Sequence, residues 1–362
     1  MNKISGKIIN HNKSFLGEVI FDDKIKEVNT LTSLDIDQYI IPGFIDLHCH
    51  GGNGFDTMEG SKSIENLSKF HLNKGTTTLL PTTMTGTFDK TFKALKDFNL
   101  NFKNNNKKNI LGVHLEGPFI NNKKLGAQPN YAIEPSFEFV EEISKIADIK
   151  IVTLAPELDG ADKLIDSLIK SKINVQIGHS LAEYKCCREI MKKYPIGFTH
   201  LYNAMSGNDH RNPGVLTAAL SHSKYAEIIC DFNHVSEPAI KIAKKCIERL
   251  YAVTDAIGAT GLDNGFYDFI DMAIEKKDNV AVLKNSSTLA GSVIDMHTTF
   301  INLLQINFSL EEAVAMTSYN AAQYINEKKL GHIEENLISN FLVLDSFFKI
   351  KEIYLNGRKI NT

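Results

Sequence analysis

Short apolar runs rich in β-forming residues alternate with amphipathic stretches throughout the central part of the sequence. This alternation is typical of a parallel sheet covered by helices, and eight such units predict an α/β fold, a TIM-like (β/α)8 barrel. A doubly wound open sheet is the structural alternative, but no GxGxxG motif opens a helix to support a dinucleotide site. The expected strands cover residues 41–48, 76–80, 110–116, 149–154, 173–179, 197–200, 226–231 and 250–255.

The two ends of the chain differ from the central part because they carry only short strand-like segments. The N-terminal end contains KISGKIIN and FLGEVIFDDKIKEV, and the C-terminal end contains NFLVLD and KIKEIYLNGRKI. Neither end has enough alternating strand to bury a core alone. We therefore expect residues 1–40 and 332–362 to form a small β-sandwich domain together, with the barrel domain, residues 41–331, inserted between them.

The composition excludes several classes of partner. With 43% hydrophobic and 23% charged residues, the chain is typical of an ordinary globular protein. A net charge of -3 gives no electrostatic case for binding nucleic acid. The opening MNKISGKIIN lacks the apolar core of a signal peptide, and no run approaches the ~18 apolar residues of a membrane helix. We expect neither nucleic acid nor a membrane among the partners.

The cysteines indicate a reducing compartment. There are five, an odd number, and no CxxC pair occurs among them. Cys186 and Cys187 are neighbours, so a disulfide framework is not expected, and we predict a cytoplasmic location. Cys49 lies between two histidines and points to the opposite face of a strand, so we interpret it as a packing residue.

The stretch IPGFIDLHCHGGNG holds the first candidate ligands. If it is a strand, alternation places Asp46, His48 and His50 on one face, and the following glycines let the chain turn over a crowded site. Two imidazoles at i and i+2 are well placed to bind one metal ion. The HxH pattern alone is a weak signal, because paired histidines also occur as ordinary polar residues.

Polar residues follow the same pattern at later strand ends. GVHLEGP, INVQIGHS, GFTHLYNAM and YAVTDA each place a histidine or carboxylate where an expected strand ends. Barrel active sites are built at this rim from several strand ends at once. A single buried histidine is more often a hydrogen-bonded core residue than a ligand, but several on one rim indicate a site. The residues concerned are His48, His50, Glu116, His179, His200 and Asp255.

The residue types indicate metal-assisted hydrolysis. Imidazoles and carboxylates suit Zn²⁺ and also Fe²⁺ or Mn²⁺. Glu116, His179 and His200 would make three ligands and leave a position open for water, whose pKa a metal ion can lower to about 7. Asp255 would then accept the proton of the water and later protonate the leaving amine. The structural alternative for Asp255 is an N-cap of the following helix.

A specific resemblance rests on six motifs. PGFIDLHCHGG, VHLEGPF, IGHS, FTHLYNAM, VTDA and TLAGS together resemble the N-acetylglucosamine-6-phosphate deacetylases of the amidohydrolase superfamily, over nearly the whole chain. The resemblance implies removal of acetate from N-acetylglucosamine 6-phosphate to give glucosamine 6-phosphate, in amino-sugar catabolism and recycling. It also implies a homodimer.

The resemblance further implies roles for individual residues. Glu116, His179 and His200 match the main metal ligands, and Asp255 matches the acid/base residue. Family members that keep the HxH motif can hold two ions, with the glutamate bridging them, so one or two ions of zinc or iron, with manganese as a further candidate, are expected. His114 is expected to support the ligands without binding metal. The residues that match substrate-binding positions are Asn203, Ala204, Arg211, His234 and Leu289, of which Arg211 and His234 correspond to phosphate-binding positions and can act across the dimer interface.

One position departs from the family pattern. Where many members have a histidine that touches the acetamide carbonyl, this chain has Gln128, in KLGAQPN. A glutamine amide can donate a hydrogen bond to that oxygen but cannot carry a full charge. A second metal ion could polarise the carbonyl and lessen that demand.

Two other functions remain open from the sequence. The first is a deacetylase of the galacto epimer, or another amidohydrolase that acts on an acylated amine. Relatives with a bridging carboxylated lysine are disfavoured, because the fourth run, IKIVTLAPE, ends without a lysine. The second is a catalytically inactive barrel that serves as an assembly subunit, which loss of ligands would indicate; here every ligand position is filled.

Overall fold

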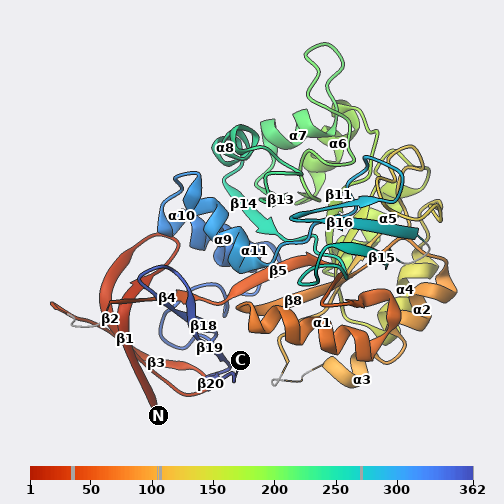
Figure 1. Ribbon diagram of the computed structural model, residues 1–362. Helices are drawn as coiled ribbons and strands as arrows, with labels where there is room; N and C mark the ends of the chain where they lie inside the picture. Colours follow the sequence, from red (N-terminus) through yellow and green to blue (C-terminus); the bar gives the residue numbers. More distant parts are fainter. Residues whose placement is uncertain (34–36, 104, 106–107, 270–271, 362) are drawn as a thin grey trace.

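A computed structural model describes residues 1–33, 37–103, 105, 108–269 and 272–361. Figure 1 shows two parts, a large α/β body and a smaller sheet, and both chain termini lie at the smaller sheet. The polypeptide crosses between the two parts near Gly43, because β4 (Gln38–Pro42) belongs to the small sheet and β5 (Phe44–Cys49) to the large body.

The large body is built on parallel strands, which confirms the predicted fold class. Within the described residues, β12-β11-β10-β9-β8-β5 form one curled six-stranded sheet and β13-β14 a parallel pair. A parallel bridge between Cys49 and Ala256 links β5 to the end of β14, and the Leu201 N–H donates to the Glu227 carbonyl at 2.9 Å. The pair thus completes the wall. The remaining strands are β8 (Thr76–Thr83), β9 (Val113–Glu116), β10 (Ile149–Leu154), β11 (Asn174–Ile177), β12 (Gly197–Phe198), β13 (Tyr225–Ile229) and β14 (Arg249–Val253).

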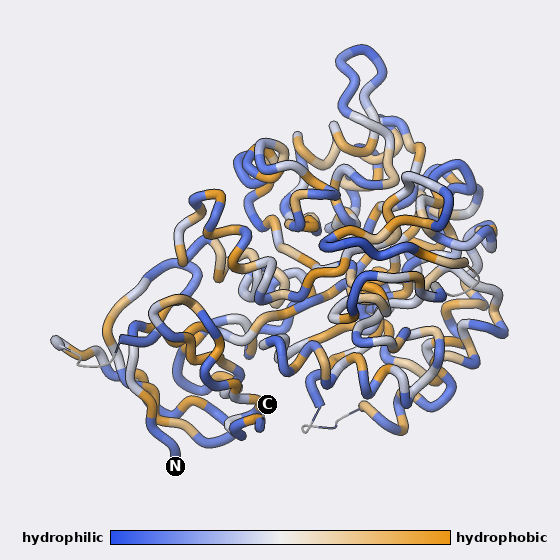
Figure 2. The backbone as a smooth tube through the Cα atoms, viewed as in Figure 1, coloured by the Kyte–Doolittle hydropathy of each residue, from blue (hydrophilic) through white to orange (hydrophobic). Residues whose placement is uncertain are grey.

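Helices cover the outside of this wall through apolar faces. In α5 (Ala161–Lys170) the buried positions Ala161, Leu164, Ile165 and Leu168 recur at helical spacing, and they join the main hydrophobic core. Figure 2 shows the same alternation of apolar and polar positions along the surrounding helices. The other helical segments are η1 (Thr57–Glu59), α1 (Ser61–Asn73), α2 (Phe88–Leu95), α3 (Phe98–Phe102), α4 (Phe137–Ile146), α6 (Tyr184–Lys193), α7 (Val215–His222), α8 (Glu237–Cys246), α9 (Met296–Gln305), α10 (Leu310–Val314), the π-helical turn η2 (Ala315–Tyr319) and α11 (Asn320–Tyr324).

The small sheet combines strands from both ends of the chain. Its order among the described residues is β20-β19-β18-β4-β1-β2-β3, so C-terminal β18 pairs directly with N-terminal β4. The division into residues 1–40 with 332–362 and residues 41–331 stays a prediction, and the pairing of β4 carries the small sheet as far as Pro42. Its other strands are β1 (Asn2–Ile9), β2 (Ser14–Phe21), β3 (Ile25–Thr30), β18 (Phe341–Asp345), β19 (Ile350–Leu355) and β20 (Arg358–Lys359).

Two small additions were not predicted from the sequence. A three-stranded antiparallel sheet follows β14, and a short ribbon follows His50. The loop after β17 reaches the site described below. Among the described helices, none combines the length and apolar character needed to cross a bilayer. The strands of the short ribbon are β6 (Gly51–Gly52) and β7 (Phe55–Asp56). Those of the three-stranded sheet are β15 (Gly265–Phe269), β16 (Met272–Lys277) and β17 (Val280–Leu283).

We predict that Phe341→Ala destabilises the small sheet. Phe341 is fully buried, with its ring centroid 4.8 Å from that of Phe21 and 4.7 Å from that of Tyr354. Removing a buried phenylalanine ring costs about 3–5 kcal/mol, which should appear as a clear fall in melting temperature. Phe347, which is 79% exposed, provides the control, because Phe347→Ala should leave the melting temperature nearly unchanged. Equal melting temperatures for the two variants would contradict this packing.

Candidate active site

Three side chains from different strand ends converge at the rim of the barrel. Glu116 is the last residue of β9, and His179 and His200 follow β11 and β12. Glu116 Oε1 lies 3.2 Å from His179 Nε2 and 3.1 Å from His200 Nε2, and the two nitrogens are 3.0 Å apart. All three residues are buried. The structure therefore brings together the first group of candidate metal ligands.

A second group lies against the first. His48 and His50 extend from the end of β5, with their Nε2 atoms 3.2 Å apart. Asp255 Oδ1, after β14, lies 3.4 Å from His48 Nε2 and 3.2 Å from His50 Nε2. Glu116 joins the two groups, because its Oε2 lies 3.3 Å from His50 Nε2 and its Oε1 3.5 Å from His48 Nε2.

The outer nitrogens of three of these imidazoles fix their tautomers. His179 Nδ1 lies 2.7 Å from the Lys124 carbonyl, and His50 Nδ1 lies 3.1 Å from the Thr82 carbonyl. Because a carbonyl oxygen only accepts, each Nδ1 must carry a proton and each neutral ring presents a bare Nε2 lone pair to the cluster. His48 Nδ1 is held in the same way, 2.9 Å from a carboxylate oxygen of Glu227.

The arrangement fits a metal ion. Lone pairs and carboxylate oxygens about 3 Å apart repel each other in a buried site unless a proton or a metal cation lies between them. Donor atoms around one tetrahedral zinc lie roughly 3.3 Å apart, given bond lengths of about 2.0–2.2 Å, and the separations of 3.0–3.2 Å in the Glu116 group are close to this value. Within the described residues, His48, His50 and Asp255 form a second group with metal-binding geometry.

Charges in the cluster shift the pKa values of its members in opposite directions. Burial lowers the pKa of the His50 imidazole, but the carboxylates of Asp255 and Glu116 outweigh it and raise this pKa to about 9. Burial raises the pKa of Asp255, but His48 and His50 outweigh it and lower this pKa to about 2. Asp255 is therefore ionised at neutral pH.

The backbone at these positions is strained. His179, His200 and Asp255 have positive φ values of 48°, 27° and 50°. This region is unfavourable for residues other than glycine, and such residues concentrate at functional sites. The three positive-φ positions thus coincide with members of the cluster.

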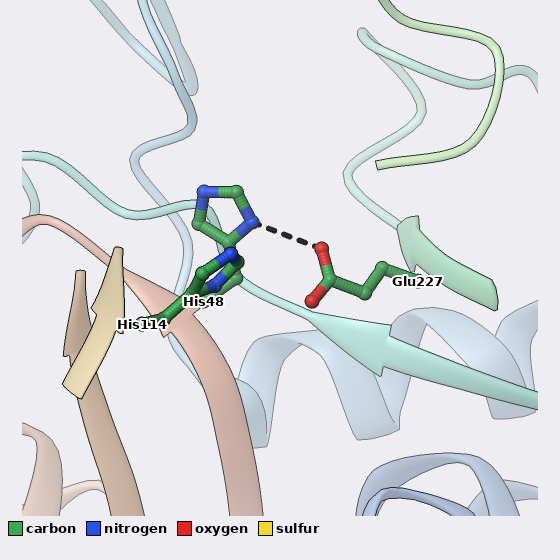
Figure 3. A group of neighbouring side chains, drawn as sticks. All are labelled: His48, His114 and Glu227. Atoms are coloured by element: carbon green, nitrogen blue, oxygen red, sulfur yellow. Dashed lines mark hydrogen bonds and ion pairs between the residues drawn. The ribbon is translucent and has the colours of Figure 1, made fainter. Parts of the chain in front are cut away.

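Glu227 is a supporting residue that the sequence analysis missed. It lies within β13, fully buried, and its Oε2 accepts from His48 Nδ1, as Figure 3 shows, and from the His200 backbone N–H at 3.3 Å. Gln176 Nε2 donates to its other oxygen at 2.9 Å. The only signal in the sequence is a carboxylate within an otherwise apolar strand, YAEII.

His114 and Asp46, from the first motifs, support the site without facing its centre. His114 lies beside His48 in Figure 3, but its Nδ1 is 3.0 Å from the Leu47 carbonyl and its Nε2 is 2.7 Å from Thr153 Oγ1. Both ring nitrogens are therefore occupied, as expected for a supporting role. Asp46 accepts from Thr254 Oγ1 at 2.6 Å, which ties β5 to the strand end that carries the catalytic aspartate candidate.

Gln128 contacts a candidate metal ligand. Its Oε1 accepts the Thr85 backbone N–H at 2.7 Å, which turns its amide nitrogen toward Glu116, and Nε2 donates to Glu116 Oε2. In the structure, this amide therefore stabilises the carboxylate, a contact that the sequence analysis did not foresee. Gln128 also lines the pocket above the cluster.

A pocket of about 450 Å³ opens above the cluster and holds most of the predicted substrate-binding residues. Lys123 and Lys124, which the sequence analysis did not single out, add positive charge to its wall. Arg211 lies elsewhere, on an exposed loop before α7 that projects from the body in Figure 1. The predicted residues that line the pocket are Gln128, Asn203, Ala204, His234 and Leu289.

Comparison with known proteins identifies the class. Residues 39–360 match the model of the Amidohydrolase family, and the chain belongs to that family. Within it, the chain is 35% identical over 330 residues to an N-acetylglucosamine-6-phosphate deacetylase of Lysinibacillus sphaericus, which covers 89% of this chain and 85% of the relative. It is 36% identical over 302 residues to the enzyme of the same name from Bacillus subtilis, covering 80% of this chain and 76% of the relative.

A solved structure of a deacetylase of this name has the same fold. The N-acetylglucosamine-6-phosphate deacetylase of Thermotoga maritima superposes with a TM-score of 0.93 at 29% identity, and each chain is covered to 99%. The resemblance inferred from the six motifs is thereby confirmed. The agreement extends over the barrel and the small sheet alike.

We predict that Glu116→Gln lowers the metal content of the purified protein more than any other single change at the site. Its two oxygens face both groups of imidazoles, so loss of its charge weakens both. Metal analysis per chain by mass spectrometry checks this. The control is His222→Ala, because His222 is exposed and bonds to the Tyr184 hydroxyl. Wild-type metal content in Glu116→Gln would contradict the assignment.

Proposed function

We propose that this chain hydrolyses the acetamide of N-acetylglucosamine 6-phosphate to give glucosamine 6-phosphate and acetate. The observation that carries the proposal is the position of Glu116, His200 and Asp255 at the floor of a pocket whose wall includes His234. A hydrolytic centre and a candidate phosphate-binding group thus lie in one cavity. The similarity to deacetylases of this name supports the same substrate.

We propose that Glu116, His179 and His200 hold one divalent ion and that His48 and His50 hold a second, with Glu116 between them. Zinc or iron suits these nitrogen and oxygen donors, and manganese is a further candidate. A bound ion supplies Lewis acidity toward the acetamide oxygen and lowers the pKa of water in the site.

Asp255 acts first as the general base and then as the general acid. Its carboxylate takes a proton from the attacking water as the water oxygen bonds to the acetamide carbon and the C=O π pair moves onto the carbonyl oxygen. Asp255 then gives that proton to the sugar nitrogen as the carbonyl re-forms and the C–N bond breaks. The acetic acid released passes its proton to the amine, so the products are acetate and the protonated amino sugar. The backbone on both sides is fixed, because the Asp255 N–H donates to the His48 carbonyl at 2.9 Å and its carbonyl accepts from Ser292 N–H at 2.7 Å.

Gln128 contributes to this mechanism by orienting and stabilising the carboxylate of Glu116. Its amide holds one carboxylate oxygen of Glu116, and the Thr85 N–H fixes the orientation of the amide. Gln128 also lines the pocket, where donation to the acetamide oxygen, the role predicted from the sequence, is the alternative. In either role it acts on charge by hydrogen bonding and takes no proton.

Several finer features are part of the proposal. Arg211 projects on its exposed loop, a position suited to a residue that completes the pocket of a second protomer, so we propose a homodimer. We also propose a cytoplasmic location, which the five free cysteines of the described chain support. The galacto epimer remains the alternative substrate, and an inactive assembly subunit is disfavoured because each ligand position is filled.

We predict that the protein releases acetate from N-acetylglucosamine 6-phosphate with a kcat/KM at least about tenfold above that for N-acetylglucosamine. Hydrogen bonds to a charged group are worth about 1.5–3 kcal/mol, which corresponds to tenfold or more in affinity. Acetate release from both sugars and from N-acetylgalactosamine 6-phosphate checks this. Preference for the galacto compound would select the alternative, and no acetate from any of the three would refute the proposal.

We predict that Asp255→Asn lowers kcat by about 10²–10⁴-fold, because the amide cannot accept a proton from water. Gln128→Ala should lower kcat less, since Gln128 contributes a hydrogen bond and no proton transfer. Both rates are measured with N-acetylglucosamine 6-phosphate after matching metal content between the variants. Equal losses of kcat would contradict this division of roles.

A further inference from the structure

A buried aspartate holds the candidate phosphate-binding histidine from behind. Asp231 and His234 lie in the turn between β13 and α8, and their side chains are 1% and 7% exposed. Asp231 Oδ2 lies 2.7 Å from His234 Nδ1. Asp231 Oδ1 accepts the backbone N–H groups of Asn233 at 2.9 Å and of His234 at 2.8 Å. The carboxylate therefore fixes both the ring and the turn that carries it.

This contact decides which protons the ring carries. A carboxylate only accepts hydrogen bonds, so His234 Nδ1 must be the protonated nitrogen that faces Asp231. The other nitrogen, Nε2, then carries a proton only when the ring is a full imidazolium. A phosphate monoester dianion, the main form above its second pKa of about 6, also only accepts, so a neutral His234 held in this way would turn a lone pair toward it. His234 binds phosphate well only as a cation.

The surrounding charges favour that cation. Burial lowers the pKa of His234, but the hydrogen bond and the charge of Asp231 outweigh burial, and this pKa is raised. The charge of Asp255, across the pocket, acts in the same direction. The carboxylate contact and the surrounding charge thus both favour the imidazolium over the neutral ring.

We propose that Asp231 is a positioning residue that keeps His234 doubly protonated, so that His234 Nε2–H donates to the phosphate of the substrate. The inference rests on the proposed function, because it requires a phosphorylated ligand in this pocket. Asp231 lies outside the catalytic cluster. Its negative charge is behind the ring, so His234 separates this charge from the phosphate.

The test is Asp231→Asn, which keeps the shape of the side chain and removes its charge. We expect KM for N-acetylglucosamine 6-phosphate at pH 7.5 (roughly one unit above the usual histidine pKa of about 6.5) to rise about tenfold or more, with a much smaller change in kcat. Lowering the pH should restore KM in the variant, since His234 then protonates without help. Asp345→Asn is the matched control, because Asp345 Oδ1 likewise accepts two backbone N–H groups, those of Phe347 and Lys349.

A double-mutant cycle with His234→Gln separates this role from general damage to the turn. If Asp231 acts through His234, Asp231→Asn should raise KM no further in a protein that already carries His234→Gln. Additive losses, equal loss for N-acetylglucosamine, or a KM defect that persists at low pH would overturn the inference. If the wild-type protein itself does not distinguish the phosphorylated from the unphosphorylated sugar, the proposed function fails instead.

Discussion

The site depends on the close approach of carboxylate and imidazole groups that the fold brings together. Glu116 Oε1 and the Nε2 atoms of His179 and His200 lie 3.0–3.2 Å from one another in a buried site. The hydrogen bond of His179 Nδ1 to the Lys124 carbonyl fixes the tautomer of that ring, so its Nε2 lone pair faces Glu116. A buried cluster of carboxylate and imidazole groups of this kind is suited to hold a cation, and the same cation supplies the hydrolytic chemistry.

Most of the barrel and the ligand groups could be predicted because both follow from local patterns. Alternation of apolar runs with amphipathic stretches identifies the parallel strands, and the carboxyl ends of parallel strands meet at one rim. Glu116, His179, His200 and Asp255 each come at such an end, so position along the chain was enough to bring them together. The pairing of both termini in one sheet followed from the fact that neither end alone supplies enough strand.

Other features depend on contacts that no local pattern records. Glu227 is one polar residue within an apolar strand, and only the assembled barrel places it behind His48. The orientation of Gln128 toward Glu116 depends on a backbone N–H from another loop, that of Thr85. The three-stranded sheet β15-β16-β17 was not foreseen, because its strands are short and lie after the last barrel strand, outside the alternation of strands and helices.

The most direct measurement is a crystal structure of the purified protein with metal located by anomalous scattering. We expect a peak within about 2.0–2.2 Å of Glu116 Oε1, His179 Nε2 and His200 Nε2, in crystals grown from protein that releases acetate. A second peak beside His48 and His50 would establish two ions. An active protein with no anomalous peak between Glu116 and the two histidines would contradict the account.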